Sequence, residues 1–192
     1  MPQYNIKTTD IEKAYSLGLL PQRNDPHYFY QDTSSRSNLR NFILSSENRR
    51  IINKTQEFTY KKIPLKYDLD IQKQIFSWLK ILKWDFPISS VKTIFTKHIF
   101  NYLYVWYDQN QNIAAYAVCY FSKKISHIAY VFYDPKYDHG NLPIRLVLQV
   151  IIDSQQENLD YCYLGRFSQN VGYYKRTMPG FEYIDTGIWK SL

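Results

Sequence analysis

The apolar positions in the second half of the chain alternate between strand patterns and one helix pattern. Residues 102–107, 113–121 and 125–133 are β-prone runs separated by short polar turns, and they predict an antiparallel meander. Residues 142–156 carry a helix pattern, and residues 161–164 form another short apolar run. A strand, a crossover helix and a second strand predict a βαβ unit, whose two strands pair in parallel within a buried sheet.

The first half of the chain has shorter and more polar segments. We expect short helices over 10–17 and 45–58, an amphipathic helix over 70–82, and strands over 27–30 and 39–44. Polar residues 32–38 predict a loop, basic residues 59–69 predict a linker, residues 91–100 fit no pattern, and 183–189 predict a last strand. This organisation indicates an N-terminal basic subdomain over 1–60 and a larger domain over 61–192.

The charge of the chain suggests what kind of partner it binds. The net charge is +7, with a pI of about 9.2, and such a balance favours a polyanion because bound phosphates release counterions. A mildly basic, solvated protein is the alternative. The 19 tyrosines reflect either an AT-rich coding sequence or rings that stack on bases.

The sequence also predicts the compartment. Cys119 and Cys162 each lie in a predicted strand, which indicates two buried thiols in a reducing cytosol and no disulfide framework or metal site. The first ten residues lack a signal-peptide pattern, and no apolar run approaches the ~20 residues of a transmembrane helix. We therefore expect a cytoplasmic protein.

The order of the predicted elements is similar to the GNAT acyltransferase fold, an α/β (α+β) fold with a mixed central sheet, preceded here by a small N-terminal α/β extension. A coenzyme A cradle needs a Gly-rich turn whose N–H groups face the pyrophosphate. Here the turn holds Gly140 alone, and Pro143 has no N–H to donate. An acetyl-CoA-dependent N-acetyltransferase is therefore a disfavoured alternative. His139 is the histidine nearest this predicted crevice, and the four histidines show no ligand spacing.

Two tripeptides in this region carry a more specific resemblance. Tyr133-Asp134-Pro135 follows the long strand, and Tyr163-Leu164-Gly165 follows the crossover helix. A Tyr174-Lys175 pair comes next, with Pro179 and Glu182 soon after. This series resembles the C-terminal half of the aminoacyl-tRNA–protein transferases, the family of the arginyltransferases and the bacterial aspartate/glutamate leucyltransferases.

The N-terminal half agrees with this family in order. Residues 27–30 are similar to its short aromatic strand, Leu39-Arg40 resembles its Pro-Leu-Arg, and residues 45–54, with Arg49-Arg50, resemble its Ser-rich, Arg-Arg helix. Residues 33–37 replace the family's Cys cluster with Thr, Ser and Arg, so we expect no metal. The family's N-terminal Cys segment has no counterpart, which motivates another alternative, a non-catalytic tRNA- or RNA-binding module.

The resemblance implies aminolysis of an ester: an N-terminal amine attacks the carbonyl that joins an amino acid to tRNA. Asp134 and Tyr133 are the candidate catalytic residues, with Asp134 accepting the amine proton or holding an ammonium. The candidate substrate and tRNA contacts are Arg40, Arg49, Arg50, Tyr163, Arg166, Tyr174 and Lys175. A solvated basic face and buried strand tyrosines are the structural alternatives for these residues.

The function that the resemblance implies is transfer of Arg or Leu from charged tRNA to proteins with acidic N-terminal residues. Such a product would be marked for degradation through the N-degron pathway. The expected partners are charged tRNA, as co-substrate in place of a cofactor, and an acceptor protein, with neither metal nor membrane. Residue patterns alone leave the transferred amino acid open.

Overall fold

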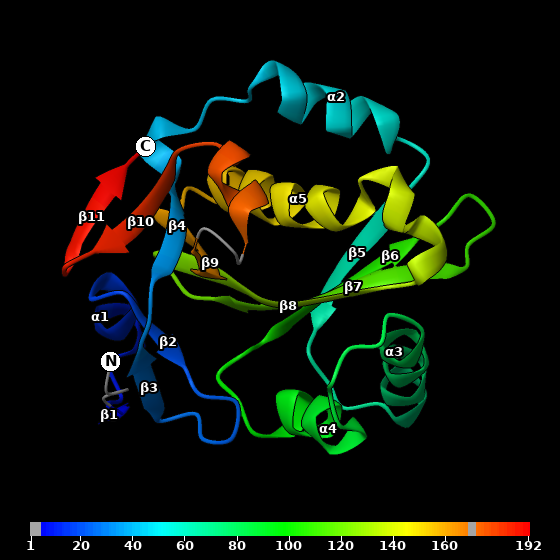
Figure 1. The fold of residues 1–192 in the computed structure, drawn as a ribbon, viewed down its shortest axis with the longest axis horizontal. Helices are drawn as coiled ribbons and strands as arrows, with labels where there is room; N and C mark the ends of the chain where they lie inside the picture. Colours follow the sequence, from blue (N-terminus) through cyan, green and yellow to red (C-terminus); the bar gives the residue numbers. More distant parts are fainter. Residues whose placement is uncertain (1–4, 169–171) are drawn as a thin grey trace.

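The computed structural model describes residues 5–168 and 172–192, apart from the side chains of residues 5 and 138–140. Most strands form one mixed eight-stranded sheet in the order β11-β10-β4-β9-β8-β7-β6-β5. A three-stranded antiparallel sheet of order β1-β3-β2 lies beside it (Figure 1). Within the large sheet, the strands are β4 (Ser34–Asn38), β5 (Thr59–Pro64), β6 (Tyr102–Tyr107), β7 (Ile113–Phe121), β8 (Ile125–Tyr133), β9 (Tyr161–Arg166), β10 (Phe181–Asp185) and β11 (Ile188–Ser191).

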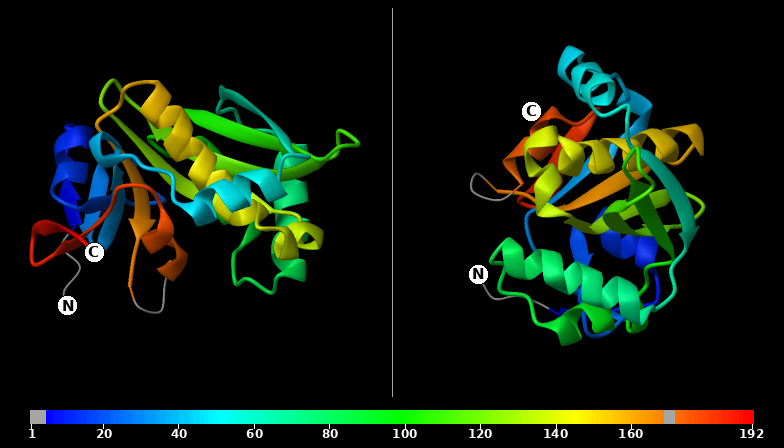
Figure 2. Two further views of the ribbon diagram at one scale, coloured as in Figure 1. Left: turned by 90° about the horizontal axis from the view of Figure 1, so that it is seen from above. Right: turned by 90° about the vertical axis from the view of Figure 1, so that its right-hand side faces the viewer.

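The helices cover both faces of this sheet. The remaining elements are β1 (Asn5–Lys7), α1 (Ile11–Ser16), β2 (Leu19–Pro21), β3 (Tyr28–Gln31), α2 (Ser46–Lys54), α3 (Leu69–Ile81), α4 (Ile88–Thr96) and α5 (Leu142–Gln156), with 3-10 turns η1 (Leu39–Asn41), η2 (Pro135–Gly140) and η3 (Tyr173–Thr177). One face carries α5, with α2 outside it, and the other carries α3, α4 and the small sheet (Figures 1 and 2). The fold is thus α+β in layers around one sheet.

The predicted meander and crossover unit are confirmed. β6, β7 and β8 pair in antiparallel order, and α5 then leads into β9, which pairs with β8 in parallel. α5 is amphipathic because its apolar residues recur at helical spacing, and Leu146, Val150 and Ile151 are fully buried against the sheet. Cys119 and Cys162 are buried free thiols in this core, as expected.

Residues 34–38 correct the prediction of a polar loop, because they form β4 in the interior of the large sheet. Ser34, Ser35 and Ser37 are completely buried, since a strand between β9 and β10 leaves room for small side chains. Arg36 pairs with Glu182 at 2.7 Å, and its guanidinium also lies 3.8 Å from the Tyr161 ring centroid. Residues 34–38 are therefore a buried strand despite their polar composition, and their side chains form hydrogen bonds with neighbouring strands.

Four further boundaries differ from the sequence prediction. Residues 39–44 are a 3-10 turn followed by coil, and residues 59–64 are the edge strand β5, where Pro64 is tolerated at the strand end. Residues 88–96 form α4, and the last predicted strand is a hairpin of β10 and β11. Residues 34–38 join the sheet of the larger predicted domain, while the division at residue 60 stays a prediction.

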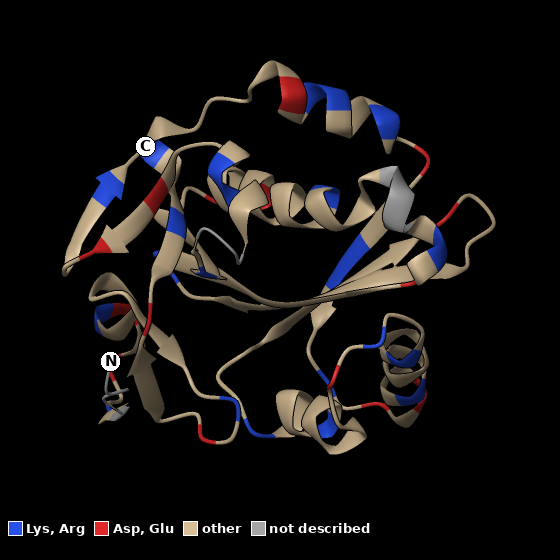
Figure 3. Cartoon of the chain, in the orientation of Figure 1, with Lys and Arg blue, Asp and Glu red and all other residues tan. Residues whose placement is uncertain are grey.

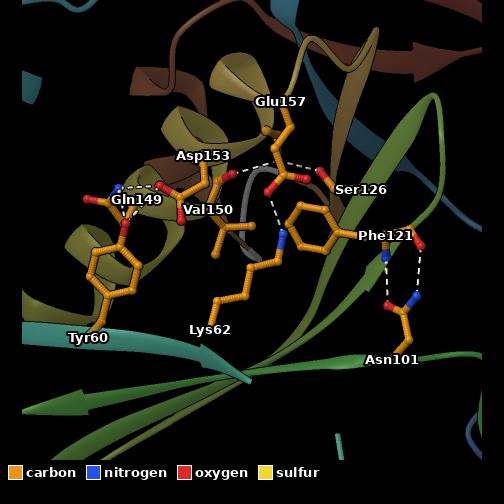
Figure 4. A network of polar contacts seen from close by, with 10 residues as sticks. Tyr60, Lys62, Asn101, Phe121, Ser126, Gln149, Val150, Asp153 and Glu157 are labelled. Atoms are coloured by element: carbon orange, nitrogen blue, oxygen red, sulfur yellow. Dashed lines mark hydrogen bonds and ion pairs between the residues drawn. The ribbon is translucent and has the colours of Figure 1, made fainter. Parts of the chain in front are cut away.

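Polar side chains bind edge strand β5 to helix α5. The Tyr60 hydroxyl donates to Asp153 Oδ1 at 2.9 Å, and Lys62 Nζ lies 2.5 Å from Glu157 Oε1 (Figure 4). Lys62 also lies over the Phe121 ring, at 3.5 Å from its centroid. The residues that sequence reasoning assigned to a linker thus hold the crossover helix in place.

Candidate functional site

The candidate site lies where β8 and β9 separate. The two strands pair over three positions, from Ile125–Tyr161 to His127–Tyr163. Beyond that, β8 shifts register against β7 at the position of Ala129, and β9 shifts against β4 at the position of Leu164. A bulge bends its strand and increases its twist, so two bulges at the same level drive the strands apart.

A cavity of about 390 Å³ opens in this separation. Its walls come from both diverging strands, from the first turns of α5, from η3 and from the segment between α3 and α4. The residues that line it are Trp84, Ile128, Ala129, Val131, Tyr133, Pro143, Ile144, Val147, Leu164, Tyr174 and Lys175. We call it the apolar pocket, because aliphatic and aromatic groups make up most of that lining.

Lys175 brings the one charge among the described residues that line the apolar pocket. Its ammonium donates to the carbonyl oxygen of Arg166 at 2.6 Å. Burial of this side chain lowers the pKa of the Lys175 ammonium to about 8, because desolvation disfavours the charged form. A cation that titrates close to neutral pH can donate a hydrogen bond to a developing oxyanion.

Gly165 lies beside Lys175 and His127 at the end of β9. Its φ of +76° is a conformation that residues with a Cβ rarely adopt. A Cβ built there would lie 3.9 Å from Lys175 Nζ and 3.7 Å from His127 Nε2. The glycine of the Tyr-Leu-Gly tripeptide thus completes the β9 bulge and lies between these two side chains.

His127 is a buried group beside this bulge that the sequence did not single out. The Tyr15 hydroxyl lies 2.7 Å from its Nδ1 atom. Burial, followed by the charge of Lys175, lowers the pKa of His127 to about 3, so the imidazole is neutral at pH 7. Helix α1 thereby positions a neutral ring next to the point where β8 and β9 separate.

A second cavity, of about 360 Å³, lies on the side of the small sheet. It is lined by Pro21, Gln22, Arg23, Asn24, Tyr30, Asp32, Tyr130 and Arg166. Arg166 Nε is 3.3 Å from Asp32 Oδ2, and Arg23 donates to Ser90 Oγ at 3.0 Å. We call it the polar pocket, and one of its lining residues, Arg166, accepts a hydrogen bond from Lys175 of the apolar pocket.

Four predicted site residues lie at these two pockets. Tyr133, Tyr174 and Lys175 line the apolar pocket, and Arg166 lines the polar pocket. Tyr133 packs edge-to-face against Trp84, with ring centroids 6.3 Å apart. Lys175 and Trp84, which are far apart in the chain, therefore line one cavity.

Asp134 and Tyr163 lie outside both linings. The Asp134 carboxylate accepts from the backbone N–H of Lys136 at 3.1 Å, which caps η2, and it lies 3.5 Å from the Lys136 ammonium. Tyr163 is 1 % exposed, and its ring lies 4.8 Å from that of Tyr15. A ring enclosed in this way cannot stack on a base, so the structure contradicts that role.

The three upstream arginines lie away from the pockets and have local partners. Arg40 pairs with Asp160 at 2.9 Å, Arg49 donates to the Leu44 carbonyl at 2.6 Å, and Arg50 forms an ion pair with Glu47. The hydrogen bond from Arg50 also lowers the pKa of the Glu47 carboxyl. Helix α2 nevertheless carries a row of basic positions on the outside of the molecule (Figure 3).

Sequence reasoning missed Trp84, Arg23 and His127. Trp84 and Arg23 belong to turns without a motif, so no spacing marked them. His127 alternates with apolar neighbours in β8, and a buried polar residue in a strand was the available signal. The side chain of His139, considered earlier for this crevice, lies outside the described residues.

The described residues hold no group of three or more His, Cys, Asp or Glu side chains that could bind a metal. None of the helices in that part of the chain combines the length and the apolarity needed to cross a membrane.

The N-terminus of α5 lacks a side-chain cap, and Asn141 there has a φ of 63°. Pro143 in the first turn has no N–H, so this helix start offers one N–H group fewer to a pyrophosphate.

Several solved structures share the fold. L-PGS from Bacillus licheniformis aligns with a TM-score of 0.55 and 14 % identity, over 88 % of this chain and 53 % of that one. The C-terminal domain of an Agrobacterium fabrum protein assigned as a lysylphosphatidylglycerol synthetase gives 0.54 and 14 %, over 85 % and 53 %. The chain thus spans about half the length of these structures.

A GCN5-related glucosamine N-acetyltransferase region of a fungal multi-domain protein aligns with a TM-score of 0.51 and 10 % identity, over 93 % of this chain and 23 % of that one. These likenesses establish a GNAT-like α+β fold with a mixed sheet, as the element order predicted. No curated protein sequence matches the chain. The family model for the C terminus of arginine-tRNA-protein transferase matches residues 27–183, and the chain therefore belongs to this transferase family.

Proposed function

We propose that this protein transfers an amino acid from charged tRNA to the N-terminal amine of proteins that begin with an acidic residue. The observation that carries the proposal is a hydrogen bond between residues that line two pockets of opposite chemistry. Lys175 lines the apolar pocket, Arg166 lines the polar pocket, and the Lys175 ammonium donates to the Arg166 carbonyl. Two substrates, one in each pocket, would react near this hydrogen bond.

The apolar pocket is the donor side in this proposal. The aminoacyl ester would place its carbonyl near the Lys175 ammonium, which would donate to the oxygen as negative charge develops on it. The amine nitrogen forms a bond to the carbonyl carbon, the ester bond to the ribose breaks, and a proton passes from the amine to the ribose oxygen. The ester is already activated, so positioning supplies much of the remaining catalysis.

The polar pocket is the acceptor side. Arg166 and Arg23 would bind the carboxylate of an N-terminal Asp or Glu side chain, because guanidinium groups bind carboxylates with paired hydrogen bonds. Asp32 already pairs with Arg166, so an incoming carboxylate would compete with it. The acceptor amine has an unperturbed pKa of about 7.7–8.0 and is partly neutral at physiological pH.

Two roles from the sequence remain proposals. The basic positions of α2, including Arg49 and Arg50, would contact tRNA phosphates, and this predicts transfer that weakens steeply with salt. Asp134 would hold an ammonium or accept a proton only after releasing its cap on η2. An N-terminal residue added in this way would mark the acceptor for degradation.

The test combines charged tRNAs, this protein and peptides that begin with Asp or Glu. Matched peptides that begin with Asn or Gln keep the shape and remove the charge. We expect the labelled amino acid to join the acidic peptides, and Arg166→Gln to reduce the difference between acidic and amide peptides. Absence of transfer with every charged tRNA, under conditions where a related transferase works, would refute the proposal.

A further inference from the structure

We infer that the amino acid carried by the tRNA donor is apolar and of the leucine class, rather than arginine. This inference rests on the proposed function and specifies its substrate. The reason is the chemistry of the apolar pocket, which would enclose the side chain of the transferred residue. The name of the family points to arginine, so the inference departs from that name.

The walls of the apolar pocket suit an aliphatic or aromatic side chain. Val131 and Leu164 face it from the two diverging strands, and Ile144 and Val147 face it from α5. Burying an apolar side chain against such walls is favourable because it removes apolar surface from water. The volume of about 390 Å³ lies within the range of small-ligand pockets.

The same walls are unfavourable for a guanidinium. None of the described residues that line the pocket is Asp or Glu. A buried cation needs a carboxylate or several acceptors, and without them its desolvation is not offset. Lys175 would also repel a second cation below about pH 8, where its ammonium is charged.

The aromatic wall does not reverse this preference. Trp84 is 44 % exposed and meets Tyr133 edge-to-face, so one edge of the pocket is formed by rings. A cation over a ring face gains less than its desolvation costs when no carboxylate is near. The rings instead add apolar surface for a branched or sulfur-containing side chain.

The first experiment uses one tRNA body charged in turn with Leu, Met, Phe, Arg or Lys, so that the amino acid alone changes. We expect kcat/KM for Leu, Met or Phe to exceed that for Arg and Lys by at least tenfold. Equal rates for all five would show that the pocket does not discriminate between side chains. Either that result or faster transfer of Arg would overturn the inference, while the proposed function stands. No transfer from any of the five would refute the proposed function, and the inference would fall with it.

The second experiment places a carboxylate in the pocket. Ile144 lies in the first turn of α5, where a negative charge is favoured by the helix dipole, so Ile144→Glu should fold. The control is Ile144→Gln, which has the same shape and no charge. We expect Ile144→Glu to shift the Arg-to-Leu ratio of kcat/KM at least tenfold towards Arg, and Ile144→Gln to leave Arg disfavoured. The same ratio in both variants and the parent chain would overturn the inference.

A binding measurement gives a readout that needs no turnover. The probes are 3′-leucylamino- and 3′-arginylamino-3′-deoxyadenosine, in which an amide replaces the reactive ester. The leucyl probe should raise the melting temperature of the parent chain more than the arginyl probe at equal concentration, and Ile144→Glu should narrow the difference. A larger shift with the arginyl probe would contradict an apolar donor.

Discussion

Lys175 provides the sharpest test of the proposed site, because its charge and its titration can be changed separately. Lys175→Met removes the ammonium and keeps an unbranched side chain, whereas Lys175→Arg keeps a cation that stays protonated throughout the working range. In the proposed reaction the ammonium donates to the developing oxyanion. Removing one such donor lowers kcat by roughly 10²–10³-fold in other enzymes, and we expect a similar loss of kcat in Lys175→Met.

The pH dependence follows from the direction of the pKa shift. Burial lowers the pKa of Lys175 from 10.5 to about 8, so the charged donor is lost as the pH rises through about 8. The acceptor amine must be neutral and gains reactivity over the same interval, since its unperturbed pKa is about 7.7–8.0. We expect a narrow bell-shaped profile of kcat/KM near pH 8. The alkaline limb should disappear in Lys175→Arg.

The stability of the protein provides an independent check on the same group. The lowered pKa means that folding disfavours the charged form, so the penalty is complete below about pH 8 and disappears above 10.5. The full shift corresponds to roughly 3 kcal/mol. Partial solvent access and the hydrogen bond to the Arg166 carbonyl reduce this, and we expect Lys175→Met to gain about 1–2 kcal/mol at pH 7.

The assay measures initial rates of transfer to an acidic peptide between pH 6 and 10, together with urea unfolding at pH 7 and pH 10.5. A variant Lys175→Met with unchanged kcat would refute the oxyanion role. An alkaline limb of the same midpoint in Lys175→Arg would show that another group titrates. A stability gain in Lys175→Met that persists undiminished at pH 10.5 would contradict the desolvation argument.

Three further changes test how the site is held. Gly165→Ala should lower the free energy of unfolding in urea by about 1–2 kcal/mol, because the backbone there has a φ of +76°. The matched control is Gly187→Ala, where φ is +82° and the space around the glycine is open. A much larger loss of stability at Gly165 alone would reveal a clash. Glu182→Gln should cost about 3–5 kcal/mol by leaving a buried guanidinium without its carboxylate, and a loss below 1 kcal/mol would refute that reasoning. Tyr15→Phe should cost about 1–3 kcal/mol by removing the partner of His127 Nδ1, and unchanged stability would show that the hydrogen bond is dispensable.

Local patterns were sufficient where one period dominated. β6, β7, β8 and α5 were predicted because their apolar residues follow strand or helix spacing over many positions. β4 was missed because its buried residues are serines and Arg36, whose burial depends on partners distant in the chain. β5 was missed because an edge strand that is largely exposed has little apolar alternation to detect.

Only part of the candidate site could likewise be predicted from the sequence. The Tyr-Asp-Pro and Tyr-Leu-Gly tripeptides indicated the ends of β8 and β9, and Lys175 and Arg166 were expected near them. Trp84 and Arg23 reach the pockets through the packing of other elements against β8, and no spacing along the chain records that packing. His127 lies in β8 outside both linings, and its partner Tyr15 is distant in the chain. Tyr163 was assigned to a ligand, whereas its ring packs against α1.

The sequence by itself determined the fold class and the family, because the order of the central elements and the short motifs are properties of neighbouring residues. It predicted a site at the end of the crossover unit, which stays a prediction, and it left the transferred amino acid open. Tertiary structure decided the rest: two bulges separate β8 from β9, and the walls of the resulting cavity come from five separate parts of the chain. The polarity of a cavity depends on residues that are distant in the chain, so only the tertiary structure could indicate an apolar donor.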